Sequence, residues 1–481
     1  MDILQEILDT WSTEAQDEKS NRYFYNIKDI DSIKNGKKFF IIGRKGSGKT
    51  AIAKFLDSQK TYSHFSIKLN FKSFPFNELY KLYDDGYTFP NQYITIWKYV
   101  IYSNIAKMLI KNENINLELR RKLEIIYQKD PLSLAGKIKQ WTDIDFKLHL
   151  ASFSAKRQDE QIETTWMEKV EILEKLLFDN IDESQYYIIF DELDEDYREI
   201  ISRNKDNEYL SLIISLFKAV QNIKSIFEDK NNTILPIVLL RDDIYEILTD
   251  NDKNKWYNHT IYINWNLDNL KDLLAFRISR TIDTNSSEIL GFKDAWFKIF
   301  VNKKVPFGNV RNRKFANIFN HIARLTHLRP RDFTFYILEC AKISKQKHDE
   351  LISIETVKQA DEAFSNYLKR EVQDEIFAVL PNINKIFNIF SQFKKQTFKH
   401  NDIKQFYTKN SLFNDLSKEE QNIDFVLKIL FHFSIIGNQP TPDIRVFKYT
   451  NKEATINYKM PFTIHRGFFR SLNVNKTSNK T

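Results

Sequence analysis

The segment Gly43–Thr50, with the sequence GRKGSGKT, constrains what this chain can fold into more than any other stretch. It fits the pattern G-x-x-x-x-G-K-[ST] in full, and it holds three of only 10 glycines among 481 residues. The apolar run KKFFIIG leads into it, and TAIAKFLDSQ after it has the apolar spacing of a helix. A strand, a glycine-rich loop and a helix in this order form the usual context of a phosphate-binding loop.

The glycines of this segment have a chemical reason. Phosphate oxygens must come close to backbone N–H groups, which side chains would prevent, and some loop positions need the positive φ that glycine adopts without strain. The start of the next helix adds unpaired N–H groups and the positive end of a dipole. In such a loop Lys49 reaches the β- and γ-phosphates, and the Thr50 hydroxyl binds Mg²⁺. The residues predicted to bind ATP are Gly43, Arg44, Lys45, Gly46, Ser47, Gly48, Lys49, Thr50 and Ala51; the alternative is a glycine turn without nucleotide.

Two adjacent acids follow a second apolar run. In YYIIFDELDED, the five residues Tyr186–Phe190 predict a buried parallel strand, and Asp191 and Glu192 come at its end. Ligands of such sheets bind outside the carboxyl ends of the strands. We therefore predict that Asp191 holds Mg²⁺ and that Glu192 orients or activates the attacking water. The alternative is a strand that merely ends in acidic residues.

Arg241 ends the next predicted strand, within TILPIVLLRDD. A charged residue at the tip of a core strand, on the edge where phosphates bind, suggests a sensor of the γ-phosphate. The alternative is a salt bridge with Asp242 or Asp243.

Two further arginines flank a predicted helix start. In LTHLRPRDF, Pro330 fits the first turn of a helix, where its missing N–H costs nothing. Asp332 lies in the same turn, where a carboxylate is favoured. Arg329 and Arg331 could reach bound phosphate from a helical lid, or they could pair with surface acids.

Spacing and periodicity divide the chain into parts. Lys49 and Asp191 are 142 residues apart, more than a compact sheet needs, which predicts a helical insertion at about 75–180. Residues 266–380 are predicted to be helical throughout. Further on, two helices with a turn near Thr397, a third helix capped by Ser417 and Glu420, and a hairpin turning at Asn451–Lys452 predict a winged helix. The expected domains are a P-loop ATPase core at 1–265, a lid at 266–380, a winged helix at 381–472 and a disordered tail at 473–481.

The charge of the chain is concentrated near its C-terminal end. Residues 381–481 hold 16 lysines and arginines against 7 acids, whereas the other 380 residues hold 56 against 57. A basic module on a neutral body predicts contact with a polyanion, here DNA. A solvated basic face and a protein-docking module are the alternatives. The lysines expected to contact phosphates are Lys394, Lys395, Lys399, Lys404, Lys448, Lys452 and Lys459.

Cysteine usage and hydropathy predict a cytoplasmic protein that does not enter a membrane. Cys340 is the only cysteine, so no intrachain disulfide can form. The N-terminal residues are acidic and amphipathic, unlike a signal peptide. The most apolar stretch, Tyr93–Ile110, is interrupted by lysine, serine and asparagine, which favours a buried helix over a membrane span.

Several motifs together carry a family resemblance. The segments IIGRKGSGKTAIAKFL, YYIIFDELDE, LPIVLLRDDIYEIL, DKNKW, RPRDF, FSIIGN, FKYTN and IHRGFFRSLNV resemble a bacterial family of P-loop ATPases. That family is similar to STAND and origin-initiator ATPases, which are related to AAA+ proteins. The resemblance implies an α/β P-loop NTPase core with a parallel sheet, a helical lid and a C-terminal winged helix. Members of that family occur beside mobile-element and antiviral genes, so the resemblance also implies a role in defence.

The same resemblance assigns roles to residues. It implies that Gly43–Thr50 are the Walker A motif, that Asp191 and Glu192 are Walker B, and that Arg241 is the sensor-1 arginine. Arg331, with Arg329 as the alternative, looks like the lid sensor. The chain departs from the pattern in its long insertion and in lacking a clear arginine finger, for which Arg311 and Arg313 are the candidates. Assembly into a homo-oligomer is therefore left open.

These observations predict an ATP hydrolase in which Glu192, Lys49, Arg241 and Arg331 have catalytic roles and Thr50 and Asp191 bind Mg²⁺. The first hypothesis is a nucleotide-driven switch or motor on DNA, in antiviral defence or mobile-element biology. The second is a STAND-like signalling ATPase that controls a separately encoded effector without DNA. A third, a nucleotide-binding structural subunit with negligible turnover, is disfavoured by the presence of Glu192 beside Asp191.

Overall fold

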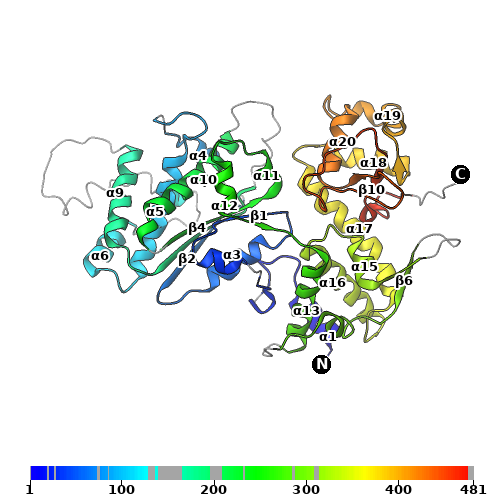
Figure 1. The fold of residues 1–481 in the computed structure, drawn as a ribbon, viewed down its shortest axis with the longest axis horizontal. Helices are drawn as coiled ribbons and strands as arrows, with labels where there is room; N and C mark the ends of the chain where they lie inside the picture. The colour runs from blue at the N-terminus through cyan, green and yellow to red at the C-terminus, as the bar shows by residue number, and fades with distance from the viewer. Residues whose placement is uncertain are drawn as a thin grey trace. The chain divides into compact units, whose positions relative to one another are not determined.

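The computed structural model describes residues 2–18, 21–26, 29–72, 76–84, 86–127, 136–138, 165–194, 208–230, 233–283, 288–307 and 314–474. The chain divides into two compact units (Figure 1). The first unit is Asn26–Asn264, and the second consists of Met1–Tyr25 together with Trp265–Thr481.

A five-stranded parallel sheet forms the centre of the first unit. Its strand order is β2-β3-β4-β1-β5, so β1 lies between β4 and β5. Every residue of β1 and β4 is buried, as expected for strands covered on both faces. Because all the strands run in parallel, their carboxyl ends share one edge of the sheet. The strands are β1 (Phe40–Gly43), β2 (His64–Asn70), β3 (Gln185–Asp191), β4 (Ile234–Arg241) and β5 (Thr260–Ile263).

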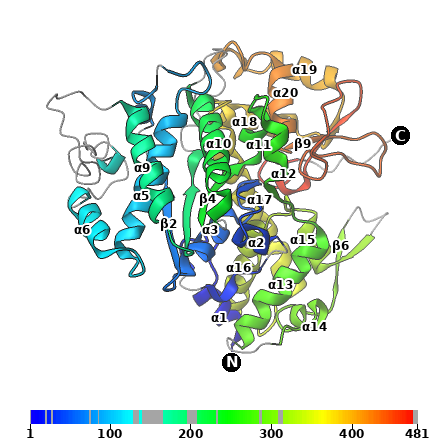
Figure 2. The same ribbon diagram turned by 60° about the vertical axis from the view of Figure 1, so that its left-hand side comes forward.

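Helices cover both faces of this sheet. The helix α3 (Lys49–Ser58) packs on one face through Ile52, Ala53 and Leu56. The helices α5 (Ile94–Lys111) and α10 (Glu208–Ile226) cover the other face (Figures 1 and 2). The helix α3 connects β1 to β2, and α10 connects β3 to β4, so the two connections run in opposite directions along the strand order. Since connections between parallel strands are right-handed, the two helices lie on opposite faces of the sheet. The prediction of an α/β P-loop NTPase core in a mainly helical chain is confirmed.

The predicted helical insertion between β2 and β3 is also confirmed for the residues that the structure describes. It contains α4 (Asn77–Tyr80), α5, α6 (Leu117–Ile126) and α9 (Trp166–Asn180). The apolar stretch around Trp97 is a helix packed inside the unit, and the Trp97 indole donates to the Leu212 carbonyl at 2.8 Å. Among the described residues no helix is both long and apolar enough to span a membrane.

Short elements complete the first unit. DKNKW, which contributed to the family resemblance, opens the helix that leads into β5. These elements are α2 (Ile30–Lys34), the 3₁₀ turn Glu228–Lys230, α11 (Asp242–Ile247) and α12 (Lys253–Asn258).

The second unit begins with the N-terminal helix α1 (Ile3–Thr10). The helix packs on α16 and α13, and the Trp11 indole just after it donates to the Thr281 hydroxyl at 2.9 Å. Residues 1–25 thus pack against segments that follow residue 265, although the sequence analysis grouped them with the core. The division of the chain into four domains stays a prediction. The helices here are α1, the 3₁₀ turn Asn21–Tyr23, α13 (Leu267–Ile282), α14 (Phe292–Trp296), α15 (Ile318–Ala323), α16 (Pro330–Gln346) and α17 (Ile354–Ile376).

The expectation that residues 266–380 are helical throughout is wrong. The strands β6 (Lys304–Phe307) and β7 (Lys314–Asn317) form an antiparallel pair, with Lys304 opposite Asn317. Pro306 cannot lie inside a helix, because it has no N–H to donate. Val305 and Ala316 are buried opposite each other, which gives the pair its apolar side.

The C-terminal segment has the element order of a winged helix. Three helices alternate with a three-stranded antiparallel sheet in the order β8-β10-β9. The two helices expected on either side of Thr397 are present, and Thr397 itself begins a short strand. The elements are α18 (Ile383–Phe393), β8 (Thr397–Phe398), α19 (His400–Thr408), the 3₁₀ turn Phe413–Asp415, α20 (Ile423–His432), β9 (Ile436–Asn438), β10 (Phe462–Ile464) and the 3₁₀ turn Arg466–Phe468.

The predicted hairpin that turns at Asn451–Lys452 is wrong. Both strands lie outside the alternating segment, and the chain between them is irregular, like the wing of a winged helix. Asn438 holds this segment: its backbone pairs with Val446, and its side chain bonds the backbone of Asn457. The alternation of residues 444–460 predicted that the two halves of this segment pair with each other. In the structure the backbone of Val446 pairs instead with Asn438 of β9.

The predicted cap of the third helix is displaced. Ser417 and Glu420 do exchange the two hydrogen bonds of a capping box, but they close a separate turn. The helix α20 starts later, and the Asn422 side chain caps it by accepting from the N–H of Asp424. The buried Glu420 carboxylate also accepts from the backbone and side chain of Asn382, so it links this turn to the start of α18.

Candidate functional site: a phosphate loop facing a buried carboxylate

The glycine-rich segment forms a tight loop between β1 and α3. Gly46 and Gly48 have φ values of 75° and 100°, which glycine tolerates and other residues resist. Gly48 is the N-cap of α3 and offers no side chain to bond the first N–H groups of that helix. A Cβ on Gly43 would lie 2.6 Å from the Ser47 hydroxyl oxygen, so a side chain there would require Ser47 to move. The loop therefore presents backbone N–H groups near the start of a helix, as an anion site requires.

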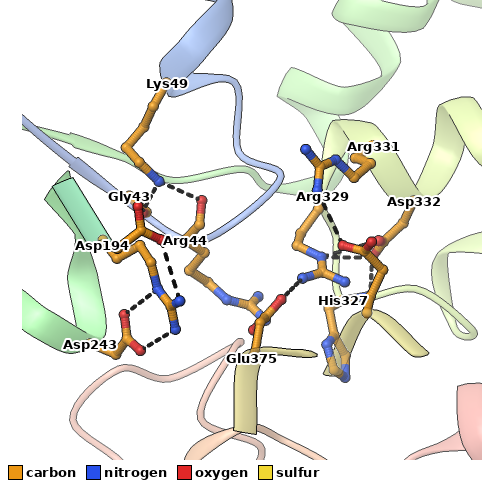
Figure 3. Close-up of polar contacts among 12 residues, drawn as sticks. Gly43, Arg44, Lys49, Asp194, Asp243, His327, Arg329, Arg331, Asp332 and Glu375 are labelled. Atoms are coloured by element: carbon orange, nitrogen blue, oxygen red, sulfur yellow. Dashed lines mark hydrogen bonds and ion pairs between the residues drawn. The ribbon is translucent and has the colours of Figure 1, made fainter. Parts of the chain in front are cut away.

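Lys49 folds back on this loop. Its ammonium donates to the carbonyl oxygens of Gly43 at 2.8 Å and Arg44 at 3.1 Å (Figure 3). Burial lowers the pKa of Lys49, and the nearby carboxylates of Asp194 and Asp242 oppose that effect. The remaining predicted loop residues, Lys45 and Ala51, lie in the loop and in the first turn of α3. Two uncharged carbonyl oxygens of the loop, those of Gly43 and Arg44, therefore hold the Lys49 ammonium against the loop.

Asp191 lies opposite this loop at the carboxyl end of β3. Its side chain is 3% exposed, and its Oδ1 is 3.5 Å from the Thr50 hydroxyl oxygen. Residues 141 positions apart in the chain thus meet because β1 and β3 are separated only by β4. The two residues predicted to bind Mg²⁺ are brought together.

Glu192 follows directly and has a left-handed backbone. Its φ is 59°, which is strained for a residue with a side chain, and its N–H donates to Asp191 Oδ1 at 3.0 Å. Burial raises the pKa of the Glu192 carboxyl, the Asp191 charge adds to the increase, and Lys68 opposes it. A half-buried carboxyl with a raised pKa fits the predicted role of Glu192 in activating water, which stays a prediction.

Oxygen ligands near the loop fit a magnesium ion. A hydroxyl and a carboxylate are hard donors, and Mg²⁺ on a nucleotide usually takes one or two protein oxygens plus phosphates and water. Among the described residues no group of three or more histidine, cysteine and acidic side chains gathers into a metal cluster. Thr50 and Asp191 therefore suit a metal that arrives with phosphate oxygens.

Arg241 is engaged by acids at the end of β4. Its guanidinium binds Asp243 through two bonds, Nε to Oδ1 at 3.0 Å and Nη2 to Oδ2 at 2.6 Å, and it contacts Asp194 at 3.4 Å (Figure 3). The register places Arg241 beside Gly43, the first residue of the loop. The salt bridge considered as an alternative is present with Asp243. The role of Arg241 as a γ-phosphate sensor stays a prediction.

The two arginines at the start of α16 have different surroundings. Arg329 is buried, and its guanidinium binds Asp332 at 3.1 Å and Glu375 at 2.8 Å (Figure 3). Burial alone would lower the pKa of Arg329, but these two carboxylates outweigh it and raise the pKa. This buried arginine links Asp332 in the first turn of α16 to Glu375 near the end of α17.

Arg331 is less enclosed than Arg329. Its side chain is 16% exposed and pairs with Glu371 at 3.1 Å and Glu14 at 2.7 Å. Pairing with surface acids was the alternative for both arginines: Arg331 pairs with the half-exposed Glu14, whereas the acids that bind Arg329 are buried. A role of either arginine as a lid sensor stays a prediction, and the finger candidates Arg311 and Arg313 lie outside the described residues.

Sequence reasoning missed three polar residues around this site. Lys68 and Asn70 come from β2, and Asp194 comes from the segment that follows β3. Lys68 donates to Asp191 at 3.0 Å, and Asn70 is level with Asp191 in the sheet. The signal was present in HFSIKLN, which alternates polar and apolar residues like a strand and has Lys68 and Asn70 at polar positions. The strand was not identified, so their meeting with Asp191 could not be predicted.

One family model matches part of the chain. It is described as the FunZ-associated C-terminal helical domain, and it matches residues 268–373. This range covers α13 to most of α17, less than a quarter of the chain. No curated protein matches the sequence.

Several solved structures are similar. The Aeropyrum pernix ORC2 protein in ADPNP–ADP complexes has 10% identity, with 92% of this chain and 89% of that chain covered and a TM-score of 0.39. The Aeropyrum pernix ORC1 protein in complex with DNA has 10% identity, 98% and 91% coverage and a TM-score of 0.38. Cdc6p from Pyrobaculum aerophilum has 11% identity, 94% and 96% coverage and a TM-score of 0.31.

Proposed function

We propose that this chain is a Mg²⁺-dependent ATP hydrolase of the P-loop class. The observation that carries this proposal is the meeting of the Thr50 hydroxyl and the Asp191 carboxylate, 3.5 Å apart, beside a left-handed glycine loop. A loop of this kind binds the β- and γ-phosphates of a nucleotide through backbone N–H groups. Thr50 and Asp191 are the residues that would hold the metal ion.

The residues of the site have separate tasks in this proposal. Lys49 exchanges the carbonyl oxygens of Gly43 and Arg44 for phosphate oxygens, which are stronger acceptors because they are charged. A bound magnesium ion supplies positive charge against the developing charge of the transferred phosphoryl group. Glu192 accepts a proton from, or orients, the attacking water. Arg241 reaches the γ-phosphate if it releases Asp243.

Replacing Lys49 tests the nucleotide site. Lys49→Ala should weaken ATP binding by about 10- to 100-fold, because a charge-assisted hydrogen bond to phosphate is lost. The matched control is Lys60→Ala, which removes an exposed lysine just beyond α3 that pairs only loosely with Asp57, at 3.4 Å. Isothermal titration with ATP measures both variants. Undiminished binding by the Lys49 variant, or equal losses in both, would refute the site.

We further propose that nucleotide state is coupled to the helices of residues 266–380, acting as a lid, and to the winged helix of 381–472. Arg331 is the better candidate for a lid sensor, since its partner Glu14 is half exposed and can be replaced by phosphate. Arg329, which is buried between Asp332 and Glu375, is better suited to a structural role. Assembly into a homo-oligomer and a role in antiviral defence stay predictions.

DNA is the proposed partner of the C-terminal module. Lys394, Lys395, Lys399 and Lys404 are exposed and lie close together in sequence, from the end of α18 through β8 into α19. Replacing all four with glutamine should weaken DNA binding and reduce the slope of log affinity against log salt by roughly 3 to 4. The control with the same loss of charge changes Lys37, Lys60, Lys81 and Lys111, which are exposed in the other unit. Equal effects of the two quadruple variants would show that only net charge matters.

One observation favours a second function, the control of a separate effector through protein contacts. The exposed side chains of α20, the helix that reads DNA in many winged helices, include Asp424 and Lys428, with the apolar Phe425 and Ile429 half-buried beside them. This surface offers few donors to base edges or phosphates. If neither quadruple variant nor the wild type binds duplex DNA, this second function becomes the better account.

A further inference from the structure

A lysine lies against the carboxylate that is proposed to bind magnesium. Lys68 is on β2, two residues before the end of that strand, and β2 pairs in parallel with β3. Its ammonium donates to Asp191 Oδ2 at 3.0 Å. The two side chains are only 18% and 3% exposed, so this is an ion pair largely removed from water.

Protein groups contact both oxygens of Asp191. The Glu192 N–H donates to Oδ1 at 3.0 Å, and the Thr50 hydroxyl lies 3.5 Å from the same atom. Lys68 contacts the other oxygen, Oδ2. The backbone and hydroxyl are neutral donors, so Lys68 is the group that balances the buried negative charge in these contacts.

Electrostatics gives such a lysine a specific consequence. A buried carboxylate without a cation is costly, and a second carboxylate, that of Glu192, follows directly in the chain. A divalent ion that enters beside Asp191 meets the positive charge of Lys68, and like charges a few ångströms apart repel strongly in a buried site. A metal ion that arrives with the negative charge of phosphates does not meet the same net repulsion.

We propose that Lys68 is a positioning residue that holds Asp191 in place in the empty site and excludes free divalent cations, so that the metal enters with its nucleotide. This inference rests on the proposed function, because it takes Asp191 as the carboxylate that faces the metal of bound ATP. Lys68 thereby joins the site from β2, and its positive charge disfavours a divalent cation that enters without phosphate. Lys68 acts through Asp191 and is not placed in contact with the substrate.

The test measures metal binding in the absence of nucleotide. Mn²⁺ serves as the probe for the full-length protein, with free Mn²⁺ quantified by electron paramagnetic resonance. Lys68→Met and Lys68→Gln remove the charge, whereas Lys68→Arg keeps it. The two uncharged variants should bind Mn²⁺ at least ~10-fold more tightly than the wild type, and the arginine variant should bind it as the wild type does. Adding Asp191→Asn to either uncharged variant should abolish the gain.

Several outcomes would overturn the proposal. If the uncharged variants bind Mn²⁺ with affinities within about twofold of the wild type, Lys68 only stabilises the fold. Thermal unfolding would then show a loss of stability in these variants. A gain that also occurs with Lys68→Arg would exclude charge as the cause, and a gain that survives Asp191→Asn would place the metal elsewhere. ATP binding in the presence of Mg²⁺ is measured separately: its absence in the wild type would refute the proposed function, while the Mn²⁺ comparison without nucleotide still judges Lys68.

Discussion

Individual residues of the phosphate loop could be predicted because neighbours in sequence are neighbours in space there. Gly43, Lys49 and Thr50 lie within eight positions, and the glycine conformations at Gly46 and Gly48 follow from the pattern itself. Asp191 could be placed opposite them because parallel strands end at one edge of a sheet. The hydrogen bond from Lys68 to Asp191 could not be predicted, because it depends on the pairing of β2 with β3, which local alternation in HFSIKLN does not specify.

Replacing Glu192 tests its role in hydrolysis. Glu192→Gln should reduce ATP turnover by about 10²- to 10⁴-fold, because an amide cannot accept the proton of the attacking water. ATP binding should persist, since the loop is unchanged, so the variant should retain bound ATP. Steady-state phosphate release and single-turnover assays measure the two effects.

The control for this prediction is Glu183→Gln. Glu183 is exposed and lies at the opposite end of β3 from Asp191, so its loss should leave turnover unaffected. A Glu192 variant that hydrolyses ATP at the wild-type rate would remove this residue from the mechanism.

Among the elements of the chain, long apolar runs were predicted well and short irregular ones were not. The strands β1, β3 and β4 consist of consecutive buried residues, apart from Gln185 at the start of β3, and their burial on both faces leaves a clear signal in sequence. The pair β6 and β7 has four residues in each strand, too few for periodicity to distinguish it from the helices around it. Residues 444–460 alternate like a hairpin, but Val446 pairs with Asn438 of β9.

The helix α10 gives a prediction about pH. Lys224 is half-buried, and its ammonium donates to the Ile234 carbonyl of β4 at 3.3 Å. Burial lowers the pKa of Lys224 from 10.5 to about 8, although Glu228 opposes the shift. Between these two values the unfolded chain binds more protons than the folded one, so the free energy of unfolding should rise with pH in that window.

Lys224→Met isolates this contribution. The variant should be more stable than the wild type by about 1–2 kcal/mol at pH 7, after allowance for partial solvent screening, and the difference should shrink from pH 8 to pH 10.5. Urea denaturation at several pH values measures it, with Lys37→Met as an exposed control. A constant difference across this range would contradict the burial of a charged Lys224.

The whole molecule combines a unit built on a parallel sheet and a glycine-rich loop with a second unit that ends in a basic module. The sequence predicted this separation of charge because composition alone locates it: residues 381–481 carry 16 basic and 7 acidic side chains. Composition could not predict that residues 1–25 belong to the second unit, since that depends on contacts such as Trp11 with Thr281. Contacts between residues far apart in the chain leave little trace in a single sequence.

The central claim is that a triphosphate binds the loop of residues 43–50 with a metal ion held by Thr50 and Asp191. A crystal structure of the full-length protein with a non-hydrolysable ATP analogue and Mn²⁺ tests it most directly. We predict an anomalous peak for Mn²⁺ between the Thr50 hydroxyl and the Asp191 carboxylate, with the Lys49 ammonium moved from the carbonyls of Gly43 and Arg44 to the phosphates. An empty loop at saturating analogue, or a metal ion remote from Thr50, would contradict the account.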